Sequence, residues 1–158
     1  MHYSDFLDLN DVSALASAIN ARARQAHAYG TISADALRDR IYACGGQCEW
    51  CQDALLHKPF EVDHIIPLKR GGSNQSDNIA VSCPACNRSK SAKHPARFAQ
   101  ETYARTGTLT PLLTRVLDHY GAEATTQQTL FADADDAPTR VADDDSPTDD
   151  PPPYVWGN

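Results

Sequence analysis

No segment of the 158-residue sequence approaches the roughly 20 consecutive apolar residues that a membrane-spanning helix requires. The start of the chain, residues 1–5, lacks the basic and then apolar composition of a secretory signal peptide. Internal repeats are also missing, which excludes a repeat array. From these absences we expect a cytoplasmic protein with no membrane partner, built as one compact domain with or without floppy ends.

A surplus of basic residues is missing as well, because 14 Lys and Arg stand against 21 Asp and Glu, for a formal net charge of −7. Taken alone, this balance argues against a nucleic-acid partner, since phosphate binding requires a basic surface. The charge is unevenly distributed, however. Residues 1–120 carry 13 basic and 12 acidic residues, whereas residues 121–158 carry Arg140 alone against nine acidic residues. The body of the chain is therefore nearly neutral, and the tail carries the charge.

The acidic tail is also rich in proline, since residues 121–158 hold five of the chain's 10 prolines. Like-charge repulsion and a shortage of large apolar side chains leave too little burial to offset the entropy lost on ordering. We therefore predict that residues 121–158 form a disordered acidic tail.

Helical patterns flank the middle of the chain. Apolar residues at helical spacing follow Asp11, which can cap a helix that runs to about Tyr29. Ser33 is a candidate cap for a second helix. Further along, residues 95–120 predict a helical hairpin interrupted at residues 107–111.

Four of the five cysteines form two C-x-x-C pairs, Cys48 with Cys51 and Cys83 with Cys86, with 31 residues between the pairs. In a reducing compartment a disulfide framework is disfavoured, and two such pairs predict a tetrahedral four-sulfur zinc site. A closed site of this kind leaves no position for water, so the zinc should be structural. The alternative is a set of buried or redox-active thiols. Cys44 is left as a free thiol without an assigned role.

The segment between the cysteine pairs predicts two strands and a helix. Residues 60–64 alternate apolar and polar like a strand, and Pro67 ends that strand. Gly71-Gly72 permits a turn, and residues 79–82 can return as a second strand. Residues 84–92 predict a helix, with proline in its first turn, where proline is tolerated. The helix start is thereby tied to the second cysteine pair.

In this order of elements, and in several motifs, the segment from Leu37 to Lys93 resembles the HNH endonucleases. The motifs that carry the resemblance are Cys48-x-x-Cys51, Glu61-x-Asp63-His64-Ile65-x-Pro67, Gly71-Gly72, Asn78 and Cys83-x-x-Cys86-Asn87-x-x-Lys90. The resemblance implies an α+β fold, with a ββα-metal core joined by the four-cysteine zinc site. The expected regions are an N-terminal helical region (1–36), the nuclease core (37–97), a C-terminal helical segment (98–120) and the tail (121–158).

The resemblance also implies a one-metal phosphodiester hydrolysis that leaves 5′-phosphate ends. The imidazole of His64 can accept a proton near neutral pH, so His64 is the candidate general base. Asp63 should point to the opposite face of the strand, where it suits a Mg²⁺ or Mn²⁺ ligand. Asn87 stands where some family members carry a histidine, and its amide oxygen can supply a second ligand.

Two further polar residues, Asn78 and Glu61, each allow two interpretations. Asn78 is predicted to brace the loop and so to orient His64, although a turn asparagine before a strand is nearly as good an interpretation. Glu61 shares a strand face with Asp63, so it can assist the metal or simply face solvent.

Basic residues gather around this segment, with six between Phe60 and Arg97. Arg88, Lys90 and Lys93 are the candidate contacts to nucleic-acid phosphates. The alternative for each of them is a solvated basic helix face.

The leading hypothesis is a metal-dependent HNH endonuclease that acts on DNA. The alternatives are a non-catalytic zinc-containing nucleic-acid-binding module and an HNH nuclease that acts on RNA. The sequence indicates neither the oligomeric state nor the biological setting.

Overall fold

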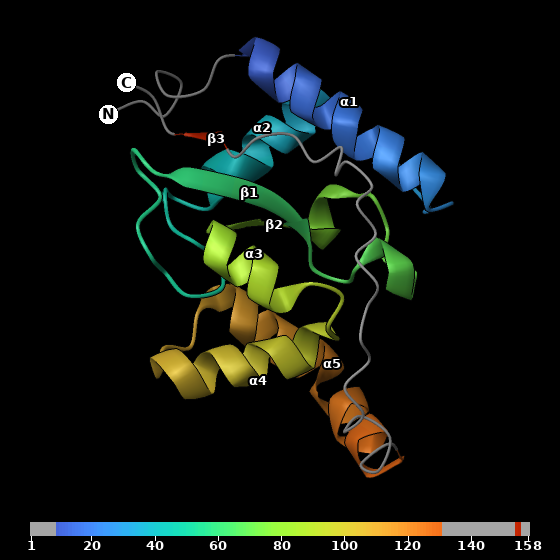
Figure 1. Cartoon of the computed structure of the whole chain (residues 1–158), viewed down its shortest axis with the longest axis vertical. Helices are drawn as coiled ribbons and strands as arrows, with labels where there is room; N and C mark the ends of the chain where they lie inside the picture. The colour runs from blue at the N-terminus through green and yellow to red at the C-terminus, as the bar shows by residue number, and fades with distance from the viewer. Residues whose placement is uncertain (1–8, 131–153, 156–158) are drawn as a thin grey trace, which may run out of the picture.

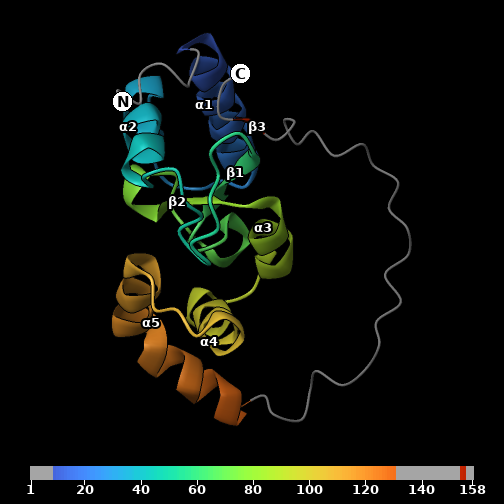
Figure 2. The ribbon, with the colours of Figure 1, turned by 90° about the vertical axis from the view of Figure 1, so that its left-hand side faces the viewer.

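The computed structural model describes the chain over residues 9–130 and 154–155. Its elements are α1 (Leu9–Gln25), α2 (Ala34–Ala43), β1 (Pro59–His64), η2 (Leu68–Arg70), η3 (Ser76–Asn78), β2 (Ile79–Ser82), α3 (Pro84–Lys90), α4 (Pro95–Thr106), α5 (Pro111–Leu130) and β3 (Tyr154–Val155). Helices α1 and α2 cover one side of a small sheet, and α3 lies on the other side, followed by α4 and α5 (Figures 1 and 2). This arrangement confirms the predicted α+β class.

The two N-terminal helices form as predicted, except that α1 begins at Leu9, so Asp11 lies in its first turn and does not cap it. In α1, Val12, Leu15 and Ile19 lie at helical spacing and are buried. The helix ends at Gln25, earlier than the predicted Tyr29, and His27 adopts a φ of 53° just after it. The chain thus leaves the helical conformation before Gly30. Ser33 caps α2 as expected, since its hydroxyl accepts a hydrogen bond from the Ala36 N–H at 3.1 Å.

The sheet is antiparallel, with strand order β2-β1-β3. The register pairs His64 with Ile79 and Glu61 with Ser82 across β1 and β2. Because side chains alternate along a strand, Phe60 and His64 lie on one face and Glu61 and Asp63 on the other. Helix α3 packs against the face of Glu61 and Asp63, as the contacts described below show.

The C-terminal hairpin packs on the cysteine region. Trp50, between the first two cysteines, meets Phe98 of α4 edge to face, with ring centroids 5.0 Å apart. At the start of α5, the Thr110 hydroxyl donates to the Glu49 carbonyl at 2.7 Å. The hairpin and its interruption at residues 107–110 agree with the sequence pattern. The cysteine region is therefore the junction between this hairpin and the sheet.

The chain beyond Tyr120 differs in part from the predicted disordered tail. Helix α5 continues to Leu130, because nothing in residues 121–130 breaks a helix except Gly121, which helices tolerate at modest cost. Tyr154–Val155 forms β3, which pairs Phe60 with Tyr154 and Pro59 with Val155 on the outer edge of β1. Residues 131–153 and 156–158, where the rest of that prediction falls, lie outside the described residues.

The described helices include none with the length and apolar character that crossing a membrane requires.

Candidate active site and metal centre

The four predicted cysteines come together at one point. Their sulfur atoms all lie within 4.8 Å of one another, and the Cys51 and Cys83 sulfurs are 3.9 Å apart. In a tetrahedron with zinc–sulfur bonds of about 2.3 Å, the sulfurs lie about 3.8 Å apart. Cys48 and Cys86 are buried, and Cys51 and Cys83 are half-buried. The cluster therefore has the donor set, the spacing and the enclosure of a structural metal site.

The cysteines also perturb one another electrostatically. The pKa of Cys48 is lowered to about 5, chiefly because its sulfur interacts with the Cys86 thiol by a hydrogen bond. The same hydrogen bond raises the pKa of Cys86, and burial raises the pKa of Cys51 to about 12. Four thiolates this close together would repel one another, so they do not all form without a cation. A bound dication would allow all four thiolates to form, which is the chemistry a zinc site uses.

Glu49, inside the first C-x-x-C pair, is a structural residue that sequence reasoning missed. Its carboxylate accepts from the Val81 N–H at 2.7 Å and pairs with Arg40 of α2 at 2.5 Å. It therefore connects the cysteine turn to β2 and to α2. An acidic residue in such a turn has no distinctive local pattern, because both of its partners are distant in the sequence.

His64 lies at the end of β1, on the face covered by α1. Its Nε2 is 3.0 Å from Oδ1 of Asn74, and its side chain is almost fully enclosed, at 9% exposure. Burial lowers the pKa of His64, with smaller contributions of the same sign from Arg22 and Lys90, and the bond to Asn74 opposes them. The imidazole is therefore held neutral, the form that can accept a proton.

Asp63 points to the opposite face, as predicted, and meets Lys90 of α3. The Lys90 amine lies 2.9 Å from Asp63 Oδ2 and donates to the His64 carbonyl at 2.6 Å. Burial raises the pKa of the Asp63 carboxyl, and Lys90 partly offsets that rise. Asp63 Oδ2 accepts no well-aligned hydrogen bond among the described residues, so its contact with Lys90 is an ion pair.

The placement of Lys90 differs from its predicted role at the surface. Its side chain is fully buried, and its amine lies 5.9 Å from the centre of the Trp50 ring. A phosphate cannot reach an amine enclosed in this way, so we do not retain the predicted phosphate contact. The three-residue spacing correctly predicted that Lys90 lies on the same helix face as Asn87. Spacing along a helix does not predict how deeply a side chain is buried.

Asn87 faces the same side of β1 from α3. Its amide nitrogen donates a short hydrogen bond to the Glu61 carboxylate. This orientation leaves the amide oxygen as the atom that Asn87 can offer to a cation. Glu61, Asp63 and Asn87 thus bring two carboxylates and an amide oxygen to one face, a donor set that fits a hard divalent cation such as Mg²⁺ or Mn²⁺.

Asn78 holds the loop between β1 and β2. Its amide nitrogen donates to the carbonyls of Ile66 (3.0 Å) and Ser73 (2.8 Å), and its oxygen accepts from the Ile66 N–H at 2.8 Å. Gly72 lies against the same loop, where an added Cβ would come within 1.9 Å of the Ile66 carbonyl oxygen. Both residues fix the backbone that follows His64.

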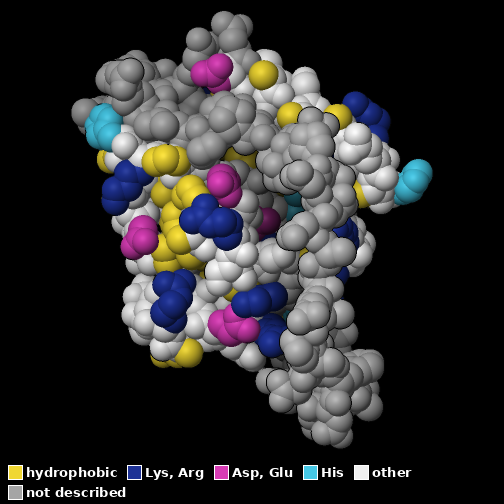
Figure 3. Space-filling model, viewed as in Figure 1, with side chains coloured by type: hydrophobic (Ala, Val, Ile, Leu, Met, Phe, Trp, Pro, Cys, Tyr) yellow, Lys and Arg dark blue, Asp and Glu magenta, His cyan; other side chains and the backbone are white. Residues whose placement is uncertain are grey.

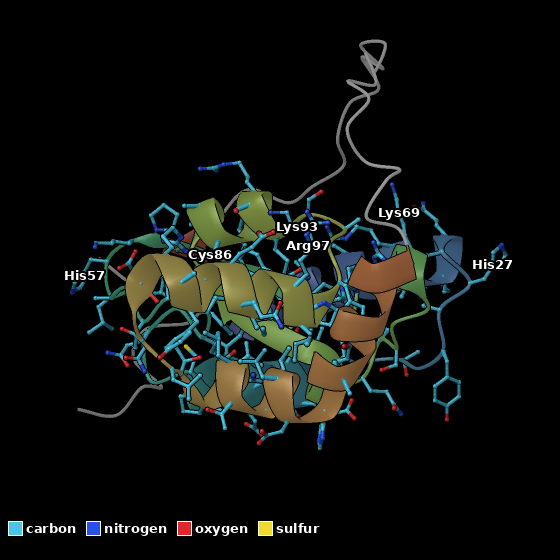
Figure 4. All side chains as sticks on the ribbon, turned by 90° about the horizontal axis from the view of Figure 1, so that it is seen from below. His27, His57, Lys69, Cys86, Lys93 and Arg97 are labelled. Carbon is cyan, nitrogen blue, oxygen red and sulfur yellow. The ribbon has the colours of Figure 1, made fainter. Side chains whose placement is uncertain are left out.

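The other two candidate phosphate contacts lie outside the core. Arg88 is exposed on α3, and Lys93 pairs with Glu101 of α4 at 2.6 Å. Figure 4 shows Lys93 beside Arg97, with His27 and His57 at opposite ends of the molecule. On the face drawn in Figure 3, Lys and Arg side chains stand in separate groups with acidic side chains among them. On this face the basic side chains of the described residues therefore do not form one continuous surface.

Asn74 is the residue nearest to His64 that sequence reasoning missed. It is fully buried, and its amide nitrogen donates to Asn20 of α1 at 2.7 Å. The sequence feature that could have indicated its role is its position in the glycine-containing loop after β1. Its partner lies 54 residues earlier in the chain, so no local pattern links the two.

Comparison with known proteins agrees with this geometry. Residues 48–93 match the model of the family described as HNH endonuclease. The chain is also similar to two proteins named CRISPR-associated endonuclease Cas9. One, from Corynebacterium diphtheriae, is 33% identical over 57 residues, which cover 35% of this chain. The other, from Actinomyces naeslundii, is 34% identical over 64 residues, or 40% of this chain.

These similarities are confined to one segment. The aligned residues span 5% of the Corynebacterium protein and 6% of the Actinomyces protein, so the comparison concerns one segment of much longer chains. The matched segment contains β1, β2, α3 and all four clustered cysteines. Residues 48–93 are thus the part of the chain that carries its similarity to the HNH endonuclease family.

Proposed function

We propose that this protein is a metal-dependent endonuclease that hydrolyses phosphodiester bonds of DNA. One observation carries the proposal: β1 presents His64 on one face, and Asp63 on the other face beside Asn87 of α3. A binding module that only needed a zinc-stabilised scaffold would not require this combination of residues.

His64 acts as the general base in this proposal. Hydrolysis requires a water molecule to lose a proton as it attacks the phosphorus, and a neutral imidazole can take that proton. The surrounding loop fixes the ring through Asn74 and fixes the following backbone through Asn78. The ring is therefore oriented before the substrate arrives, which reduces the entropic cost of reaching the reactive geometry.

Asp63 and Asn87 are the residues that would hold the catalytic cation, with Glu61 beside them. A divalent cation bound there would stabilise negative charge on the phosphate and on the leaving oxygen. Lys90 already neutralises one oxygen of Asp63 and fixes the direction of that carboxylate. Cys48, Cys51, Cys83 and Cys86 would hold the structural zinc, which joins the start of α3 to the chain before β1.

Arg88 and Lys93 would contact the phosphates that flank the scissile bond. Arg88 is exposed on the same short helix as Asn87, and Lys93 follows that helix directly. Contacts of this kind position the backbone and carry no sequence information. We therefore expect cleavage with little sequence preference from these residues.

The test is a plasmid-nicking assay with Mg²⁺ or Mn²⁺, run beside single-stranded DNA and structured RNA. His64→Ala should reduce the cleavage rate at least about 100-fold, since a general base contributes about that much or more. His27→Ala is the matched control, because the His27 side chain is exposed and has no role in the proposed mechanism, and it should cut at the native rate.

The possible outcomes distinguish the proposed mechanism from its alternatives. Equal cutting by the native protein and His64→Ala, with every metal tried, would refute the mechanism. Binding of DNA without cleavage by either protein would favour a non-catalytic zinc module. Cleavage of RNA but not of DNA would leave the proposed roles of the site residues in place and change the proposed substrate from DNA to RNA.

A further inference from the structure

A series of hydrogen bonds connects Ile32 and Asn20 of α1 to His64. It begins at the backbone of Ile32, where the donor and the acceptor are fixed. The Ile32 N–H donates to Oδ1 of Asn20 at 3.0 Å, and Nδ2 of Asn20 donates to the Ile32 carbonyl at 2.9 Å. A backbone N–H can only donate and a carbonyl can only accept. The Asn20 amide therefore has one permitted orientation, with its oxygen toward the Ile32 N–H.

The fixed orientation of Asn20 also determines the orientation of the Asn74 amide. Oδ1 of Asn20 also lies 2.7 Å from the Asn74 amide, and an oxygen at that position requires a donor. Asn74 must therefore present its Nδ2 to Asn20, which leaves its Oδ1 on the side of His64. The Asn74 backbone is held as well, because its N–H donates to the Tyr29 carbonyl at 2.7 Å.

The last link fixes a proton on the histidine ring. Asn74 Oδ1 lies 3.0 Å from His64 Nε2, and the Asn74 side chain is fully buried. Since the oxygen can only accept, Nε2 must carry the hydrogen. A neutral imidazole carries one N–H, so its other nitrogen, Nδ1, has the free lone pair.

We propose that Asn20 and Asn74 are positioning residues that select the Nε2–H tautomer of His64, so that Nδ1 is the atom that accepts the proton from water. The inference rests on the proposed role of His64 as the general base. Asn20 lies on α1, outside the matched segment 48–93. The N-terminal helices thus complete the site and do more than cover the core.

Removing the Asn20 side chain should weaken the preference of His64 for the Nε2–H tautomer without changing the ring itself. In Asn20→Ala the Asn74 amide loses its fixed acceptor and can turn over, which would place a donor against Nε2 and favour hydrogen on Nδ1. The variant should therefore show both tautomers, and its kcat should fall about tenfold with KM little changed. This loss is smaller than the one expected from deleting the base itself.

The direct measurement is the ¹⁵N spectrum of the His64 ring in the full-length, zinc-loaded protein, at about pH 8, where a histidine is neutral. The His64→Ala spectrum assigns the signals. The native ring should show Nε2–H alone. Asn74→Leu, which offers the ring no acceptor, should lose that preference. Ser17→Ala, an exposed change on α1, is the control for helix effects.

The outcomes separate this inference from the proposed function. A native ring with hydrogen on Nδ1, or an unchanged tautomer in both Asn20→Ala and Asn74→Leu, would overturn it. If Asn20→Ala does not fold, Asn74→Leu decides the question. If the native ring shows Nε2–H but the protein cuts no nucleic acid, the proposed function fails while the tautomer assignment stands.

Discussion

Single residues in this protein are defined by the side of β1 to which they point. His64 and Asp63 are neighbours in the sequence, yet one is bonded to Asn74 beneath α1 and the other is paired with Lys90 of α3. The alternation of a strand thus separates the candidate proton acceptor from the candidate cation ligand at no cost in chain length. It also surrounds each group with a different set of neighbours.

The Asp63–Lys90 pair gives a prediction at this scale. Lys90→Met should destabilise the fold by about 3 kcal/mol, because it leaves a buried carboxylate without its partner. The double variant Asp63→Asn with Lys90→Met should recover most of that loss, since no buried charge then remains. Urea denaturation of the two variants measures both values. A double variant as unstable as Lys90→Met would show that packing, and not charge, explains the effect.

The sequence was informative about some of these residues and not about others. Asp63, His64 and Asn87 lie within one short segment, and the alternation of β1 correctly predicted that Asp63 and His64 face opposite sides. The burial of Lys90 could not be read in this way, because it depends on Trp50 and on β1 packing over α3. The link between Asn20 and Asn74 joins residues 54 positions apart, which no local pattern records.

Among the elements, α4 is held to the end of α3 by a small charged cluster. The Glu101 carboxylate accepts from Lys93 at 2.6 Å and from Arg97 at 3.2 Å. Partial burial raises the pKa of Glu101, but the two cations outweigh this effect, so its pKa is lowered overall. A carboxyl with a lowered pKa stabilises the fold above its unfolded pKa and loses that contribution as the pH falls through the folded pKa.

Glu101→Gln should therefore be less stable than the native protein at pH 7, by no more than about 1 kcal/mol, because the pair is exposed and screened. The difference should shrink below about pH 4.5 and disappear in strong acid. Thermal melts from pH 7 down to the acid limit, at low and at high salt, measure it. A difference that persists in acid would indicate lost packing and not lost charge.

At the scale of the whole molecule, the cysteine cluster joins the two halves of the fold. It lies between the sheet and the α4–α5 hairpin, with Trp50 packed on Phe98 and Glu49 bonded to Thr110. The stability of the assembly should therefore depend on the metal.

Cys48→Ser, or removal of zinc by a chelator, should lower the melting temperature by many degrees and separate the unfolding of the two halves. Loss of a structural zinc ligand removes a large binding free energy that is also folding free energy. Metal analysis and calorimetry measure this together, and Cys44→Ser is the matched control, since Cys44 lies outside the cluster. A metal-free native protein with the melting temperature of the loaded protein would contradict the assignment.

The distribution of charge gives a second prediction at this scale. Residues 131–158 carry eight aspartates against Arg140, so they repel a polyanion. Replacing the eight aspartates with asparagine should strengthen DNA binding at low salt, and the gain should vanish at high salt. This variant keeps Tyr154 and Val155 in place, so a gain cannot come from loss of β3. Unchanged affinity at low salt would assign the tail no role in binding.

The pairing of β3 with β1 has a consequence for synthesis. Phe60 leaves the ribosome long before Tyr154, its partner in the register, so the outer edge of β1 is exposed while the rest of the chain is made. The cysteine cluster, β2 and α3 need only residues up to about 90 and can assemble first. Domains fold in this vectorial way during translation. The nascent chain should therefore acquire its metal and its candidate catalytic residues early and close its exposed strand edge last.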